Sequence, residues 1–476
     1  MPIPTHVRSK PIVIIGVLTA AVYFSICVFY RHGPQPYSHT ARELFAWFFC
    51  AALLILFWKG YQAISGADKP SIRMIVGFGA LFCLLAFLTV PFHSTDVFGY
   101  INRGWQQVHY GQNPYVHHLN DIPNWQADPM LREHWIYNPN PYGFLFTLLA
   151  WLITWLSAGN WWAALALFKT ANLLAYAASA WILWSASKRL PYLKPESVLY
   201  LFLWNPLILL HHIVNGHNDL LVGVLILLAA YLAITEKYFW IIPALAAATL
   251  LKFAPVLLIP PALVLVVRKS GWKVAALSCL IAGALGALIC FPYLRDWQVL
   301  RLADIQDNAT LIDNSLHSLL IHIFENIARV FSTLAAFHPI VNSTIKTLLR
   351  GGLILFVLYQ WLKIPKNFDA KAFAVKSLWI LFVLICVASS KFNAWYLAMI
   401  LPLALLLEED YPLRRLVILI TCTELLSLTF FKQAYMLNYF ALILVPTWVV
   451  LRTRKISVWQ TTDGGKPVTS PTKTQS

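Results

Sequence analysis

The sequence predicts an all-α membrane protein, a polytopic bundle of about 12–14 transmembrane helices with two long outer loops. Hydrophobic residues make up 59% of the 476 residues and charged residues only 12%, with a mean hydropathy of +0.65. A soluble domain could not bury that much apolar surface. The net charge of +16 comes from basic residues in short clusters between apolar runs, which indicates membrane topology and excludes nucleic acid as the expected partner.

Apolar runs near the length of about 20 residues that spans a bilayer define the expected helices. In chain order they cover residues 11–30, 43–60, 72–91, 160–186, 197–213, 217–235, 238–252, 253–267, 273–292, 346–364, 372–389, 394–408, 414–430 and 434–451. The run 144–158, LFTLLAWLITWLSAG, would reverse every following span if it crossed fully. We interpret it as a short or re-entrant helix, with a complete crossing as the alternative.

Lys and Arg concentrate in cytoplasmic loops, so the basic clusters orient the chain. They place both termini in the cytoplasm and the loops 92–143 and 293–345 outside. Both loops are longer than structureless connections usually are, so we expect them to fold over the membrane surface. Residues 1–452 then form one transmembrane domain, and residues 453–476, which end in a polar stretch, form a disordered cytoplasmic tail.

The segment STDVFGYINRGWQQVHYGQNPY, residues 94–115, follows the third apolar run and predicts an amphipathic helix on the outer leaflet. Ser94 or Thr95 is a suitable N-cap. The apolar side of the helix repeats at helical spacing. It consists of Val97, Ile101, Trp105 and Val108.

The opposite face of this helix carries Asp96, Tyr100, Arg103 and Gln107. Asp96 and Arg103 are about two turns apart, too far to pair as i,i+4 neighbours. We therefore expect Asp96 to be free to accept a proton and Arg103 to be free to hold an anion. The alternative for Asp96 is a first-turn acid that only complements the helix dipole.

The segments GQNPYVHH and YNPNPYGFLF are rich in turn-forming, amide and aromatic residues. Such a composition suits stacking on sugars and hydrogen bonding to their hydroxyl groups. Asn113, Tyr115 and Tyr142 are therefore candidate sugar-binding residues, together with Tyr100. The adjacent histidines at 117–118 and 211–212 point in different directions on a helix, so packing is the favoured interpretation over a metal site.

Five segments occur in an order that resembles the polytopic GT-C glycosyltransferases, and within them the bacterial polyprenol-phosphate-mannose-dependent α-mannosyltransferases. The similarity covers roughly residues 70–410. The segments are STDVFGYINRGWQQVHYGQNPY, NPYGFLF, WNPLILLHHIVNGHNDLLVGVLILLA, KFAPVLLIPPALV and KFNAWYLAMILPLALL.

The resemblance implies an all-α GT-C fold in a cell membrane, with Asp96 as the catalytic base. The family's HND segment matches His217, Asn218 and Asp219, and its lysine after the next helix matches Lys252. Its NPWY-like segment corresponds here to Asn393, Trp395 and Tyr396, with Ala394 where proline is common. The usual YGPL is YGFL at Tyr142, which alters the local turn.

The implied reaction moves a hexose, by resemblance mannose, from a polyprenyl-phosphate donor to an extracytoplasmic glycan or glycolipid acceptor with inversion. Such a displacement needs one base and positive charge at the phosphate. Arg103, Lys252 and Lys391 are the cationic candidates, since a cation at membrane depth is costly unless it faces a cavity or an anion. For the lysines the alternative is snorkelling to the interface. Membrane lipid is a further expected partner, and no cofactor or metal is expected, since the chain has no DxD motif.

Two other functions remain open from the sequence. A secondary transporter would also have many helices, but its ionisable residues usually lie near the bilayer midplane. A ligase that uses a diphosphate-linked glycan would also act outside the cell. A non-catalytic scaffold would not account for the ordered segments.

Overall fold

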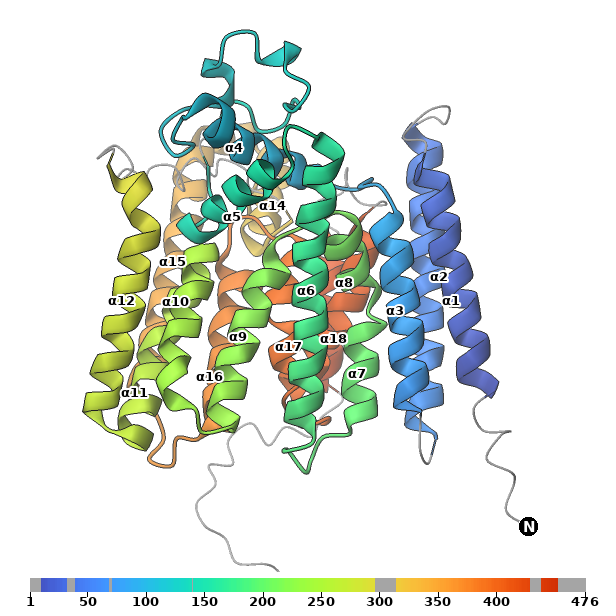
Figure 1. Ribbon diagram of the computed structural model, residues 1–476, viewed down its shortest axis with the longest axis vertical. Coiled ribbons are helices and arrows are strands. Elements are labelled where there is room, and N and C mark those ends of the chain that lie inside the picture. Colours follow the sequence, from blue (N-terminus) through green and yellow to red (C-terminus); the bar gives the residue numbers. More distant parts are fainter. Residues whose placement is uncertain are drawn as a thin grey trace, which may run out of the picture.

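The computed structural model describes residues 10–31, 39–67, 71–138, 140–295, 314–428 and 438–452. These residues form a bundle of helices that contains no β-strand in the ranges described (Figure 1). The predicted all-α membrane fold is therefore confirmed. The expected tail 453–476 and residues 296–313 of the second expected loop lie outside the described residues.

Seven helices in the described ranges are long and apolar enough to cross a membrane, and five shorter apolar helices accompany them. The first half of the chain contains α1 Lys10–Arg31, α2 His39–Ser65, α3 Ile72–Leu88, α4 Asp96–Tyr110, α5 Phe144–Leu156, α6 Trp161–Ser187, α7 Pro195–Leu203, α8 Pro206–Ile208 and α9 Asp219–Ile234. The second half contains α10 Ile241–Leu251, α11 Ile259–Ser270, α12 Trp272–Leu294, α14 Leu316–Val330, α15 His338–Leu362, α16 Ala370–Phe382, α17 Leu401–Ala404, α18 Pro412–Thr423 and α20 Val445–Arg452.

Several expected spans are interrupted helices. The expected span 197–213 is a buried run in which α7 and α8 continue into a π-helical segment at Leu209–Val214. Asn205 makes the break, because its side-chain oxygen accepts from the N–H groups of Leu207 and Ile208 and so starts α8. The run ends beside the HND segment, which places His211 and His212 inside the protein.

One end of the bundle is covered by α4, α5 and the loop 111–143, and we call it the capped end (Figure 1). α5 has 13 residues, about 20 Å, and is too short to cross a bilayer core of about 30 Å. The expected short helix at 144–158 is thus confirmed. α4 lies against α5 so closely that a Cβ on Gly104 would come within 2.3 Å of the Ala150 carbonyl oxygen.

The expected amphipathic helix begins at Asp96 with Thr95 as N-cap residue. The polar side of this helix is largely buried, because Tyr100, Asn102 and Arg103 are covered by protein. The loop 111–138 covers this face, and its backbone carbonyl oxygens accept hydrogen bonds from the polar side chains. Helical periodicity separates the two faces of α4 but does not say what covers each one.

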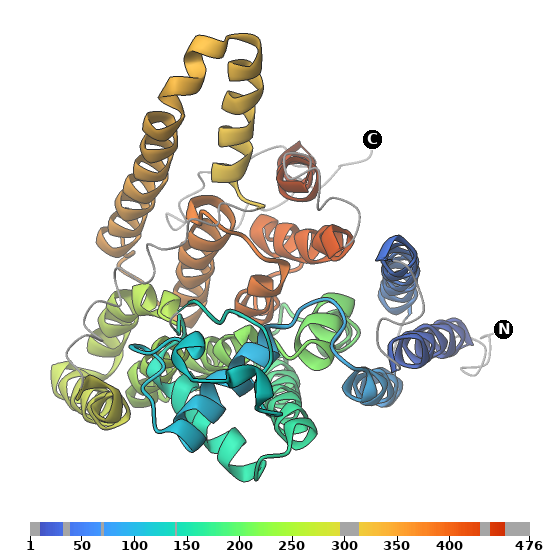
Figure 2. The same cartoon turned by 90° about the horizontal axis from the view of Figure 1, so that it is seen from above.

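The basic loops meet at the opposite end of the bundle (Figure 1). Arg268 donates to the carbonyl oxygen of Pro365 at 2.6 Å, and Lys371 pairs with Glu408. Tyr192 donates to the Leu406 carbonyl oxygen at 3.3 Å. Seen from above, α14 and the start of α15 form a pair that projects from the bundle on the side away from α4 and α5 (Figure 2).

Candidate active site

Asp96 lies at the start of α4, at the capped end of the bundle. Its backbone N–H donates to Ser94 Oγ at 3.3 Å, and its carboxylate occupies the first turn, where the helix dipole favours a negative charge. Only 19% of the side chain is exposed. The carboxylate therefore depends on protein groups for most of its stabilisation.

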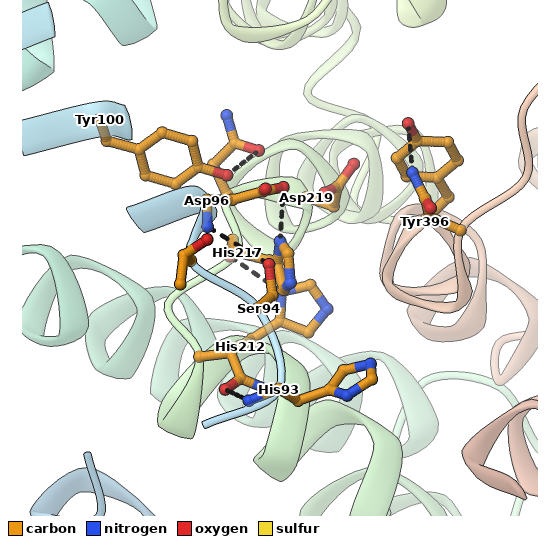
Figure 3. Close-up of polar contacts among 12 residues, drawn as sticks. His93, Ser94, Asp96, Tyr100, His212, His217, Asp219 and Tyr396 are labelled. Atoms are coloured by element: carbon orange, nitrogen blue, oxygen red, sulfur yellow. Dashed lines mark hydrogen bonds and ion pairs between the residues drawn. The ribbon is translucent and has the colours of Figure 1, made fainter. Parts of the chain in front are cut away.

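Two histidines from different parts of the chain flank this carboxylate. His134 Nε2 lies 3.5 Å from Asp96 Oδ1. His217 Nδ1 lies 3.4 Å from Asp96 Oδ2 (Figure 3). Burial by itself raises the pKa of Asp96, but the contacts with the two imidazoles outweigh it and hold that pKa well below its usual range. Asp96 is therefore an ionised carboxylate at neutral pH.

The HND segment joins the π-helical end of the buried run to α9. Gly216 makes the turn with φ of +75°, a conformation that favours glycine. The ring of His217 stacks on Trp395 with centroids 3.9 Å apart and planes at 12°. Asn218 Oδ1 accepts from the Tyr100 hydroxyl at 3.5 Å, which links this segment to α4.

Asp219 and Lys252 form an ion pair beside Asp96. Lys252 Nζ donates to Asp219 Oδ1 at 2.5 Å, and the ammonium also lies 4.0 Å from the Tyr396 ring centroid. The Asp219 side chain is 1% exposed and the Lys252 side chain 24%. Asn393 holds the ring by donating to the Tyr396 hydroxyl at 2.9 Å. Lys252 is thus paired with a carboxylate and still partly exposed.

Two phenols complete the group. Tyr100 and Tyr142 are edge-on at 5.1 Å between ring centroids. Burial, and then the negative charge of Asp96 among other neighbours, raises the pKa of both phenols well above the usual value. Both hydroxyl groups therefore stay protonated, and each also has lone pairs that can accept a hydrogen bond.

The structure thus gathers most of the predicted residues around Asp96. They come from α4, the start of α5, the HND segment, the end of α10 and the segment after α16. They are Tyr100, Tyr142, His217, Asn218, Asp219, Lys252, Asn393, Trp395 and Tyr396. Lys391 lies beside this group, with Nζ 5.5 Å from the ring centroid of Trp135, the residue after His134.

Three predicted residues lie elsewhere. The expectation that Arg103 is free to hold an anion is wrong, because its guanidinium donates to the carbonyl oxygens of Trp135 and Asn138 and to Gln106 Oε1. Burial lowers its pKa to about 10, so it remains charged. Its hydrogen bonds attach the loop to α4.

Asn113 and Tyr115 belong to a separate cluster between the start of α5 and the end of α12. Asn113 Nδ2 donates to the Tyr293 carbonyl oxygen at 3.1 Å, and the Tyr115 hydroxyl donates to the Tyr142 carbonyl oxygen at 2.8 Å. Tyr115 thus supports the backbone at Tyr142, and Asn113 holds the end of α12.

Sequence reasoning missed His134, and no helical period or segment similarity singled it out. His93 and His211 were also left out of the site, although the His211 ring lies 5.7 Å from that of His93 and 5.5 Å from that of Trp395. His211 is fully buried, and its two ring nitrogens have no hydrogen-bond partner among the described residues. No group of three or more His, Cys, Asp and Glu side chains in these residues has a geometry that could hold a metal ion.

Comparison with known proteins gives one family. The family model described as Alpha-(1->6)-mannopyranosyltransferase, N-terminal domain, matches residues 13–268, more than half of the chain. The matched range includes Asp96, the HND segment and Lys252. No curated protein and no solved structure matches the chain.

Proposed function

Because the chain belongs to the alpha-(1->6)-mannopyranosyltransferase family and is thus a membrane glycosyltransferase, we propose that it takes mannose from a polyprenyl-phosphate donor. The proposed acceptor is an extracytoplasmic glycan or glycolipid. The observation that supports this most is the meeting of one ionised carboxylate, Asp96, with a lysine, two neutral phenols and stacked aromatic rings at the capped end.

The basic loops support an orientation with the capped end outside. The end of α6, the end of α11, the connection between α15 and α16 and the start of α18 carry basic clusters and lie at the other end of the bundle (Figure 1). Such clusters usually stay in the cytoplasm. Asp96 then faces the outer surface. The lipid tail of the donor would lie in the bilayer with its sugar at the level of α4.

Asp96 is the proposed base of a single displacement. The acceptor hydroxyl oxygen bonds to the anomeric carbon while its proton passes to an Asp96 carboxylate oxygen. The bond from the anomeric carbon to the phosphate oxygen breaks, and its electron pair leaves with polyprenyl phosphate, which inverts the anomeric centre. A carboxylate with a low pKa is a weak base, which suits a late proton transfer to an attacking hydroxyl in an oxocarbenium-like reaction.

Lys252 and Lys391 are the proposed phosphate contacts. The Lys252 ammonium keeps two N–H groups beyond the one it gives to Asp219, and a phosphate oxygen can accept from them. Lys391 pairs with no carboxylate in the part of the chain that the structure describes. Tyr100, Tyr142 and Trp395 would orient the sugar by hydrogen bonding and stacking.

The test is transfer from radiolabelled polyprenyl-phosphate-mannose to acceptors in a membrane extract, with release of polyprenyl phosphate measured in parallel. The purified wild type should transfer mannose, and Asp96→Asn should be at least about 100-fold slower, the usual contribution of a general base. Asp121→Asn is the matched control, because Asp121 is an exposed carboxylate in the loop that covers α4. Equal release by wild type and Asp96→Asn would remove Asp96 as the base. Transfer only from a diphosphate-linked glycan would refute the proposed donor.

A further inference from the structure

His134 joins the cap of α4 to the carboxylate of Asp96. Its Nδ1 lies 2.8 Å from Thr95 Oγ1, and its Nε2 lies 3.5 Å from Asp96 Oδ1. His134 Nε2 is buried, and the described residues offer it no hydrogen-bond partner of normal geometry. An ionised carboxylate can only accept, so a favourable contact needs the proton on Nε2, and the neutral ring then accepts the Thr95 hydroxyl proton at Nδ1.

The backbone on both sides of His134 is held by the buried polar face of α4. Asn102 Nδ2 donates to the Arg132 carbonyl oxygen at 2.8 Å, and Asn102 Oδ1 accepts from the Arg132 N–H at 3.0 Å. Arg103 Nη2 donates to the Trp135 carbonyl oxygen at 2.9 Å. The helix that supplies Asp96 therefore also fixes the loop that supplies His134.

Gly99 leaves the space in which the His134 ring lies. A Cβ at this position would come within 2.9 Å of His134 Cδ2, closer than such contacts normally are. The ring could not move away without losing its contacts to Thr95 or Asp96. Gly99, Asn102 and Arg103 of α4 thus place the His134 imidazole against one carboxylate oxygen of Asp96.

The other groups that face or electrostatically affect Asp96 come from several elements. They are His217, Tyr100, Tyr142, Tyr396 and the pair of Lys252 with Asp219. His217 contacts the second oxygen, Oδ2, and is fixed by its stacking on Trp395. With both imidazoles in place, the carboxylate has a fixed plane and its remaining lone pairs are available to an acceptor hydroxyl.

We propose that His134 is a positioning residue for the glycosyl transfer: its Nε2–H, directed by Thr95, orients the Asp96 carboxylate for proton acceptance. This inference rests on the proposed function of Asp96. His134 touches neither donor nor acceptor in this role and acts through Asp96 alone. Its removal should therefore lower kcat and leave the KM for donor nearly unchanged.

The first experiment measures the ionisation of Asp96 without requiring transfer. Infrared difference spectra of the purified protein are recorded during acid titration, and the Asp96 carboxyl band is identified as the one absent from Asp96→Asn. His134→Leu should show this band at a higher pH than the wild type, because one of the two groups that stabilise the carboxylate is gone. His117→Leu is the matched control, an exposed imidazole of the same loop. An Asp96 band at the same pH in His134→Leu and wild type would overturn the proposal.

The second experiment measures kinetics with polyprenyl-phosphate-mannose. His134→Leu should lower kcat on the order of 10- to 100-fold, the range for losing a hydrogen bond to a charged group, and shift the acidic limb of kcat/KM to higher pH. His134→Gln should restore most of kcat, since its amide can donate in place of Nε2–H. Wild-type rates in both variants, with an unmoved acidic limb, would overturn the role of His134. If the wild type transfers no mannose, the proposed function fails, and the infrared titration still decides whether His134 keeps Asp96 ionised.

Discussion

Replacing Lys252 with methionine should destabilise the protein strongly. The substitution leaves the carboxylate of Asp219, which is 1% exposed, without the ammonium that lies 2.5 Å away. Removing one partner of a buried ion pair typically costs about 3–5 kcal/mol, because the remaining charge stays buried. Lys252 is 24% exposed, so the lower end of this range is expected, about 3 kcal/mol. The contact of the ammonium with Tyr396 adds to the loss.

The double variant Asp219→Asn with Lys252→Met separates stability from chemistry. It removes both charges, so its free energy of unfolding should be about 1–3 kcal/mol higher than that of Lys252→Met alone. The reason is that substitutions at two contacting residues are not additive. The assay is unfolding in mixed micelles by SDS titration, with polyprenyl-phosphate-mannose binding measured on the same samples. Lys237→Met, at an exposed lysine, serves as control and should change stability by less than about 0.5 kcal/mol. A double variant no more stable than Lys252→Met would refute the coupling, and one that binds donor like the wild type would refute the phosphate contact.

Three further predictions follow from α4. Arg103→Lys should lower the thermal stability without raising the donor KM, because the guanidinium holds loop carbonyl oxygens; a raised KM at unchanged stability would restore its phosphate role. Gly99→Ala should lower kcat several-fold in the transfer assay while the protein stays folded, since it displaces the His134 ring; unchanged kcat would contradict this. The folded-state pKa of Asp96 lies below the unfolded value of about 3.9, so its ionisation stabilises the fold above that value and the gain is lost as the pH falls toward the folded pKa. Thermal melts from pH 6 to 3 should therefore show a smaller acid-induced loss for Asp96→Asn than for the wild type.

Local features of the fold could be predicted well from the sequence. Apolar run length located α1, expected at 11–30 and found at Lys10–Arg31, and also the short helix α5. The start of α4 at Asp96 follows from its polar cap residues and apolar period. These features depend on residues a few positions apart along the chain, so they can be recognised from the sequence alone. Breaks inside buried runs, such as the one at Asn205, were not predicted, because hydropathy alone does not distinguish a continuous helix from an interrupted one.

Tyr100 and Tyr142 were candidates from the local composition, and other parts of the site were predictable where a segment resembles a known family. The HND residues and Lys252 were named in this way, and the structure places them near Asp96. His134 was not named, because its approach to Asp96 depends on how the loop 111–138 folds back over α4. Such a return path is fixed by hydrogen bonds between residues about 30 positions apart, which no local pattern records.

The polar face of α4 shows why the spacing of Asp96 and Arg103 was misinterpreted. The two residues share a face two turns apart, and this spacing suggested a carboxylate free to accept a proton and a guanidinium free to hold an anion. In the structure a buried guanidinium could not remain unpaired, since its charge needs acceptors, and the carbonyl oxygens of Trp135 and Asn138 supply them. The same contacts bring His134 to the carboxylate at the start of the helix. Arg103 therefore holds the loop 111–138 in place. Asp96, two turns away on the same face, is the partly exposed carboxylate that the loop residue His134 contacts.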